Sequence, residues 1–173
     1  MRMFVGLLDR NRWILLGSFA FFAVGMLLGA WGSGNPGHDW IEPNGVGHLL
    51  RNNLFSCLLI ASGFVTFGWM AVLYLFLNGF VLGTSIADQL ASGMEPLRIV
   101  LLLAPHGIFE VPALIMSGAV GLKCLDILVR MLIRPVRETL LSGVKDTAVL
   151  LVAIVVFLVA AAWMETYITP LFK

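Results

Sequence analysis

Charged residues and cysteines are both scarce in this 173-residue chain. Charged side chains make up 12% of the residues, and cysteine occurs twice, at Cys57 and Cys124. A soluble domain usually has about 25% charged residues, so most of this chain is not built to face water. The two cysteines lie far apart in or beside apolar stretches, which excludes a CxxC motif and a disulfide framework.

Basic residues are not in excess. The chain has 11 Lys and Arg against 10 Asp and Glu, for a net charge of +1. Nucleic-acid-binding domains present a strongly basic face, so no nucleic-acid partner is expected. The sequence also lacks HEXXH, a nucleophile elbow and a phosphate-binding glycine loop. We therefore predict no cofactor, no metal site and no catalytic residues. A non-enzymatic function is favoured, and an intramembrane hydrolase is the weakest alternative.

Apolar surface, in contrast, is abundant. Hydrophobic residues make up 60% of the chain, and the mean hydropathy is +0.96. A core of this size could not hide that surface from water, so lipid must be the main solvent. The sequence predicts an all-α membrane protein with about five transmembrane helices in a single polytopic domain over 1–173. The expected spans are near 13–31, 48–62, 64–90, 98–122 and 146–168.

The almost continuous apolar run 49–90 is too long for one span, and it can be divided in two ways. A break at Ser62–Gly63 gives two spans, whereas a break at Asn78–Gly79 gives one span and a re-entrant or interfacial segment. The basic segment 123–145 and the basic N-terminal arm should both face the cytoplasm, which requires an even number of crossings between them. The break at Gly63 supplies an even number. It places the N-terminus in the cytoplasm and the C-terminus outside, in the inner or plasma membrane.

Residues 124–140 alternate apolar and cationic side chains at helical spacing. The residues that set this pattern are Leu128, Arg130, Met131, Leu132, Arg134 and Arg137. The pattern predicts an interfacial amphipathic helix on the cytoplasmic leaflet. The first span is longer than the apolar core of a signal peptide, so we expect it to be a retained anchor.

Polar side chains also fall near the middle of the predicted spans. At about 1.5 Å of rise per residue, Asn78 and Glu110 lie at similar depth, and His106 lies one turn from Glu110 on the same face. Asn53, inside the second span, is a further candidate for this cluster. A polar or ionisable group in hydrocarbon costs on the order of several kcal/mol unless it is paired or hydrated. These residues therefore form the candidate site.

Two interpretations of this midplane cluster stay open. Pro105 and Pro112 bracket it, with Gly107 between them, and each proline frees a backbone carbonyl that Asn78 or His106 could satisfy. On that interpretation the cluster is a structural contact between helices. On the other, it lines a cavity for a proton, an ion, a metal or a lipid headgroup.

Glycine spacing indicates close helix packing. Gly25 and Gly29 in the first span, and Gly79 and Gly83 in the third, each form a GxxxG pattern that lets two backbones approach. Such contacts can form within one chain. They can also join two copies, so a homo-oligomer through the first helix is an open alternative.

Three stretches carry a resemblance to a known family. They are Arg51-Asn52-Asn53, Leu77-Asn78-Gly79-Phe80-Val81-Leu82-Gly83 and Ala104-Pro105-His106-Gly107-Ile108-Phe109-Glu110-Val111-Pro112-Ala113. Over 48–122 the chain resembles the stage II sporulation protein M family. The PHGxxExP run with an upstream Asn-Gly pair is the most specific part of the match.

The resemblance implies a polytopic, mostly five-span protein of the cell membrane. The sporulation member acts in engulfment of the forespore, in a complex with two other membrane-anchored proteins, one of which is a peptidoglycan hydrolase. The implied function is a scaffold in the cell envelope that organises partner membrane proteins such as cell-wall remodelling enzymes. The alternative is transport or handling of a small solute, an ion or a lipid at Asn78, His106 and Glu110.

Overall fold

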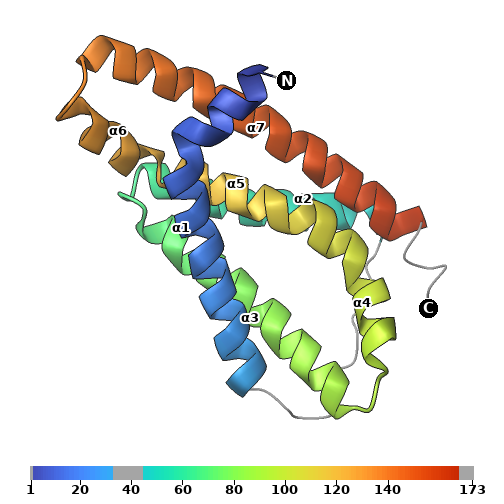
Figure 1. Cartoon of the computed structure of the whole chain (residues 1–173). Helices are drawn as coiled ribbons and strands as arrows, with labels where there is room; N and C mark the ends of the chain where they lie inside the picture. The colour runs from blue at the N-terminus through green and yellow to red at the C-terminus, as the bar shows by residue number, and fades with distance from the viewer. Residues whose placement is uncertain (1, 33–44, 168–173) are drawn as a thin grey trace.

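The computed structural model describes residues 2–32 and 45–167, and its regular structure over these ranges is entirely helical, as the sequence predicts (Figure 1). The elements are α1 (Arg2–Gly32), α2 (Gly45–Ala61), the 3-10 helix η1 (Ser62–Phe64), α3 (Trp69–Ala91), α4 (Pro96–Pro105), the π-helix η2 (His106–Glu110), α5 (Val111–Gly121), α6 (Lys123–Met131) and α7 (Val136–Tyr167).

Three helices are long and apolar enough to cross a membrane: Gly6–Gly32 within α1, Trp69–Ala91, which is α3, and Val136–Met164 within α7. The segments Pro96–Ala104 and Gly107–Gly121 meet at a bend of 50° and add a fourth crossing if the pair counts as one span. α2 has 17 residues and is shorter than these spans. The described part of the chain therefore has three or four candidate spans, where the sequence predicts about five.

The chain reverses direction between α2 and α3. η1 follows α2 directly, and the Gly68 N–H then donates to the Gly63 carbonyl at 2.7 Å. Gly68 has φ of +85°, a left-handed conformation that glycine adopts without strain. At Gly63, a Cβ would lie 2.7 Å from the Ala71 Cβ, so this turn needs a residue without a side chain. The Asn78–Gly79 pair lies inside the continuous α3.

α1 and α3 pack in parallel along two glycine pairs (Figure 1). A Cβ on Gly25 would overlap the Phe76 carbonyl, and one on Gly29 would overlap the Phe80 carbonyl one turn later. The contact is reciprocal, because Gly79 and Gly83 of α3 face the backbone of α1 at Phe22 and Met26. Both GxxxG patterns are therefore used within the chain, where they bring two backbones into direct contact.

α5 is the central helix, and it packs against α1, α2, α3 and α7. Its inner surface is made largely of small residues, which lets several helices come close. The buried residues of α5 are Ala113, Leu114, Ser117, Gly118, Ala119, Val120 and Gly121. A Cβ on Gly118 would lie 2.9 Å from the Ser18 Cβ of α1. The N-terminal end of this central helix carries the candidate site.

The predicted amphipathic helix over 124–140 is not one helix in the structure. α6 ends at Met131, a turn follows, and α7 begins at Val136. Pro135 explains the interruption, because proline disfavours the helical conformation of the residue before it and has no amide to donate. Proline suits the start of the next helix, and α7 accordingly begins at Val136 instead of near the predicted residue 146.

Candidate functional site

A buried amide–carboxylate pair joins α2 to the start of α5. Asn53 Nδ2 donates a hydrogen bond to Glu110 Oε2 at 2.5 Å. Each residue is 6% exposed. A carboxylate withdrawn from water needs donors, because burying a charge without a partner costs far more than burying it with one. The Asn53 amide supplies such a donor from a neighbouring helix.

The backbone around Glu110 departs from regular α-helix. Glu110 is the last residue of η2, and α5 starts at the next residue. Pro112 is the second residue of α5, and it has no amide to bond the carbonyl four residues earlier. The wider π turn accommodates this defect. Single π turns inside helices often occur at functional positions.

Buried polar groups of α2 and α5 continue from this pair. Cys57, one turn after Asn53, is buried and interacts with Ser117 of α5. The Ser117 hydroxyl donates to the Ala113 carbonyl of its own helix at 2.9 Å. The surroundings of Glu110 thus combine a carboxylate, an amide, a thiol and a hydroxyl. Among the described residues, no group of three or more His, Cys, Asp or Glu is arranged to hold a metal ion.

The other predicted site residues take several positions. Asn78 is half-buried in α3, where its Nδ2 donates to the Tyr74 carbonyl at 2.7 Å. His106 is the first residue of η2 and Pro105 the last of α4, and their side chains lie outside what the structure describes. Gly107 is exposed in η2. The described hydrogen bond of the site therefore links Glu110 to Asn53 of α2.

A second polar cluster, which the sequence analysis does not identify, lies where α1, α6 and α7 meet. Lys123 is 1% exposed. Its Nζ lies 3.0 Å from Asp126 Oδ2 and 3.6 Å from Asp146 Oδ2, and it also donates to Asn11 Oδ1. Asp146 in turn accepts from Arg10 Nη2 at 2.6 Å. We call this set of five residues the charged junction.

Arg130 ties α6 more closely to the charged junction. Its Nε donates to Asp126 Oδ1 at 2.7 Å, and its guanidinium also donates to the Arg10 carbonyl. Asn11 contributes as well, because its Nδ2 bonds Asp146 Oδ2 at 3.2 Å and the Leu7 carbonyl of its own helix at 2.8 Å. The sequence does carry a signal for this cluster: Asn11 and Asp146 each stand at the edge of an apolar run, next to a basic residue. The basic residues were used only to predict which side of the membrane each loop faces.

Comparison with known proteins identifies the family of this chain. The model of the stage II sporulation protein M family matches residues 18–170. The chain belongs to the stage II sporulation protein M family. An uncharacterized protein of Methanocaldococcus jannaschii is 33% identical over 124 residues, which are 70% of this chain and 69% of that relative. No solved structure matches the chain.

The match to the stage II sporulation protein M family extends well beyond the stretches 48–122 that first suggested it. It includes Asn53 and Glu110, and it also includes Lys123 and Asp146 of the charged junction. Arg10 and Asn11 precede the matched region. The match therefore covers both polar clusters in large part, together with the candidate spans from residue 18 of α1 onward.

Proposed function

We propose that this stage II sporulation protein M family member is a membrane scaffold that holds partner membrane proteins, cell-wall remodelling enzymes among them, by helix-to-helix contact. The described chain offers helices and short connections for such contacts. The glycine surfaces of α1 and α3 pack against each other within the chain, which favours other faces for contact with a partner.

The outer face of α7 is the observation that carries this proposal. Along it, exposed residues recur at helical spacing in a stripe made mainly of valine: Val152, Val155, Val156, Val159 and Trp163. Valine has few rotamers to lose, so a valine stripe packs against another helix at a small entropic cost. α5 and α2 cover the opposite side of α7, and the stripe remains open to lipid or to a partner.

Crosslinking in native membranes tests the scaffold. Val152→Phe with Val156→Phe keeps α7 apolar but changes the shape of the stripe. The matched control is Val24→Phe with Leu27→Phe on the exposed side of α1. We expect a defined membrane partner to be recovered with the wild type and the control and lost with the α7 variant. Recovery of the chain without a partner, or equal loss in both variants, would contradict the proposal.

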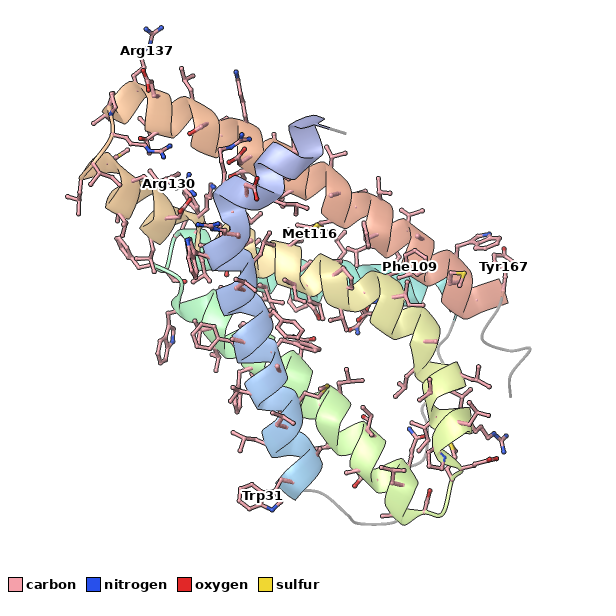
Figure 2. The ribbon with its side chains drawn as sticks, viewed as in Figure 1. Trp31, Phe109, Met116, Arg130, Arg137 and Tyr167 are labelled. Atoms are coloured by element: carbon pink, nitrogen blue, oxygen red, sulfur yellow. The ribbon has the colours of Figure 1, made fainter. Side chains whose placement is uncertain are left out.

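We further propose five crossings, with the N-terminus cytoplasmic and the C-terminus outside. In this arrangement α2 and the bent α4–α5 pair each cross the bilayer. Aromatic residues at helix ends support it, because Trp and Tyr favour the membrane interfaces. Trp31 and Tyr167 are exposed at the C-terminal ends of α1 and α7, on the side of the molecule away from Arg130 and Arg137 (Figure 2).

The Asn53–Glu110 pair supports a second candidate function, the handling of an ion, a small solute or a lipid at membrane depth. A carboxylate beside a π turn is a typical place for such a site. Proteoliposomes containing the wild type and Glu110→Gln should then differ in ion or lipid flux while both proteins fold. Equal flux in the two, or no flux above empty liposomes, would exclude this function.

A further inference from the structure

Residues 123–145 form a helical hairpin with two different sides. It consists of α6, the turn around Pro135 and the first residues of α7 (Figure 1). The two helices pack closely, because a Cβ on Gly143 would lie 2.9 Å from Ile127 Cδ1. Thr139, near the start of α7, is buried. We refer to this unit as the 123–145 hairpin.

The inner side of the hairpin is neutralised by the charged junction. Lys123 and Arg130 face Asp126, and Lys123 also faces Asp146. These cations are therefore occupied within the chain. The same contacts fix the orientation of the hairpin relative to α1, because Arg130 also bonds the Arg10 carbonyl. The hairpin is thus held in place rather than free to pivot.

The outer side combines exposed apolar residues with exposed cations. At the turn, Leu132 is 84% and Ile133 79% exposed. The other exposed large hydrophobic residues of the hairpin are Leu125, Leu128, Val129, Val136, Leu140, Leu141 and Val144. Arg134, Arg137 and Lys145 are exposed on the same unit, against Glu138 as the exposed acid. Figure 2 shows Arg137 projecting from the start of α7.

Neither water nor hydrocarbon alone suits this surface. So many apolar side chains form a patch too large for a wholly aqueous position. The arginines would be costly in the hydrocarbon, but their long stems can reach from an apolar surface to the headgroups. α7 has 32 residues. At about 1.5 Å per residue it exceeds the roughly 30 Å hydrocarbon thickness, so part of it must tilt or extend into the interface.

We propose that the 123–145 hairpin binds the anionic phospholipid surface of the membrane that the protein spans. Leu132 and Ile133 insert among the acyl chains near the headgroups, while Arg134, Arg137 and Lys145 pair with lipid phosphates. Charge complementarity selects this occupant, because the junction satisfies the inner cations and leaves a net positive outer side. The inference takes from the proposed function the placement of α7 in the bilayer, and it does not depend on the scaffold role.

Native mass spectrometry of the purified full chain tests the proposal. The protein in detergent is titrated with phosphatidylglycerol or phosphatidylcholine, and bound lipids are counted. We expect the wild type to prefer phosphatidylglycerol. Arg134→Gln with Arg137→Gln should weaken phosphatidylglycerol binding on the order of tenfold, since each cation near an anionic surface contributes measurably to binding. The control, Arg51→Gln with Arg98→Gln, makes the same charge change far from the hairpin and should lose less than about twofold.

A second variant separates insertion from charge. Leu132→Ser with Ile133→Ser keeps every cation and should also weaken phosphatidylglycerol binding, because the apolar tip no longer anchors the hairpin. The four substituted residues of the hairpin are exposed, so circular dichroism spectra and melting temperatures of its two variants should match those of the wild type. Equal phosphatidylglycerol binding by the wild type and the Arg134/Arg137 variant would overturn the proposal. So would a dimer of the chain that the tip variant dissociates, since a second copy would then occupy this surface. Because the readout is lipid binding, failure here leaves the partner crosslinking result unaffected.

Discussion

Buried polar side chains mark two places where single substitutions should have large effects. At one, Glu110 accepts a hydrogen bond from Asn53. At the other, Lys123 lies among the oxygens of Asp126 and Asp146. Removing one partner of such a pair leaves the other without compensation in low-dielectric surroundings. Substitutions that keep or remove the hydrogen-bonding atoms can therefore distinguish structural roles from chemical ones.

For Glu110, we expect the amide and the aliphatic substitution to differ. Glu110→Gln retains an oxygen that can accept from Asn53, so the free energy of unfolding should stay near that of the wild type. Glu110→Leu leaves the Asn53 donor without this acceptor and should cost about 1–3 kcal/mol. Steric trapping in bicelles measures both. If Glu110→Gln is as damaging as Glu110→Leu, the negative charge itself is needed for stability.

For the charged junction, Asp146→Asn should destabilise strongly. Asp146 faces Arg10 and Lys123, and its loss leaves Lys123 buried with one carboxylate fewer. Breaking a buried ion pair from one side costs about 3–5 kcal/mol. Glu138→Gln on the exposed side of the same helix is the control and should change stability by less than about 0.5 kcal/mol. Thermal melting in detergent compares them, and equal melting temperatures would show that the junction contributes little.

At the residue scale, the sequence indicates which polar residues are candidates for the site better than it indicates which residues they contact. It identified Glu110 from its depth in an apolar run and admitted Asn53 as a further candidate, and these two are hydrogen-bonded. It did not identify the charged junction, because Arg10 and Asp146 are separated by 136 residues. Charge patterning along a chain shows which side of a membrane a segment prefers, but it does not show which distant charges meet.

At the scale of elements, the parallel contact of α1 and α3 should be sensitive to a single methyl group. A Cβ on Gly25 would overlap the Phe76 carbonyl, so Gly25→Ala must push two backbones apart and should cost about 1–3 kcal/mol. At Gly17 of the same helix, an added Cβ meets nothing within 4 Å. Gly17→Ala should therefore be neutral or stabilising by up to about 1 kcal/mol, from helix propensity. Unfolding monitored by steric trapping distinguishes them, and similar effects at both sites would refute the close contact.

Helix boundaries can be predicted where a glycine or a proline sets them, but not where contacts with other helices set them. Gly63 and Gly68 shape the reversal between α2 and α3, and the charge pattern along the chain predicts a break there instead of at Asn78. Pro135 divides α6 from α7, a signal that helical periodicity over 124–140 concealed. Pro105 and Pro112 predict an interruption around η2. The size of the bend, 50°, depends on the surrounding helices and could not be predicted.

At the scale of the whole molecule, the proposed topology makes a direct prediction. Alkaline phosphatase, which is active outside the cytoplasmic membrane, should be inactive when fused at Gly68 and active when fused at Gly93 or after Tyr167. Fluorescent protein fusions should give the opposite pattern. Gly68 and Gly93 lie in connections between helices, so fusion there should preserve the bundle. An active phosphatase at Gly68 together with an inactive one at Gly93 would show that the orientation is the opposite of the proposed one.

The composition predicts a membrane protein, because a chain with 60% hydrophobic residues has more apolar surface than a core of this size can bury. The long apolar runs then predict helices. Function required the family, and the scaffold role remains a proposal that the valine stripe of α7 supports. Which faces stay open is a property of the assembled bundle. Gly25 and Gly29 illustrate this, because their pattern suits a dimer equally well until α3 is seen to occupy it.

The charged junction also sets an order for biogenesis. The glycine contact between α1 and α3 can close once the first 91 residues have been made, since it needs nothing beyond α3. Arg10 and Lys123, in contrast, wait for Asp146, which arrives with the last helix. A nascent chain that stops before α7 would therefore hold Lys123 with Asp126 but without Asp146.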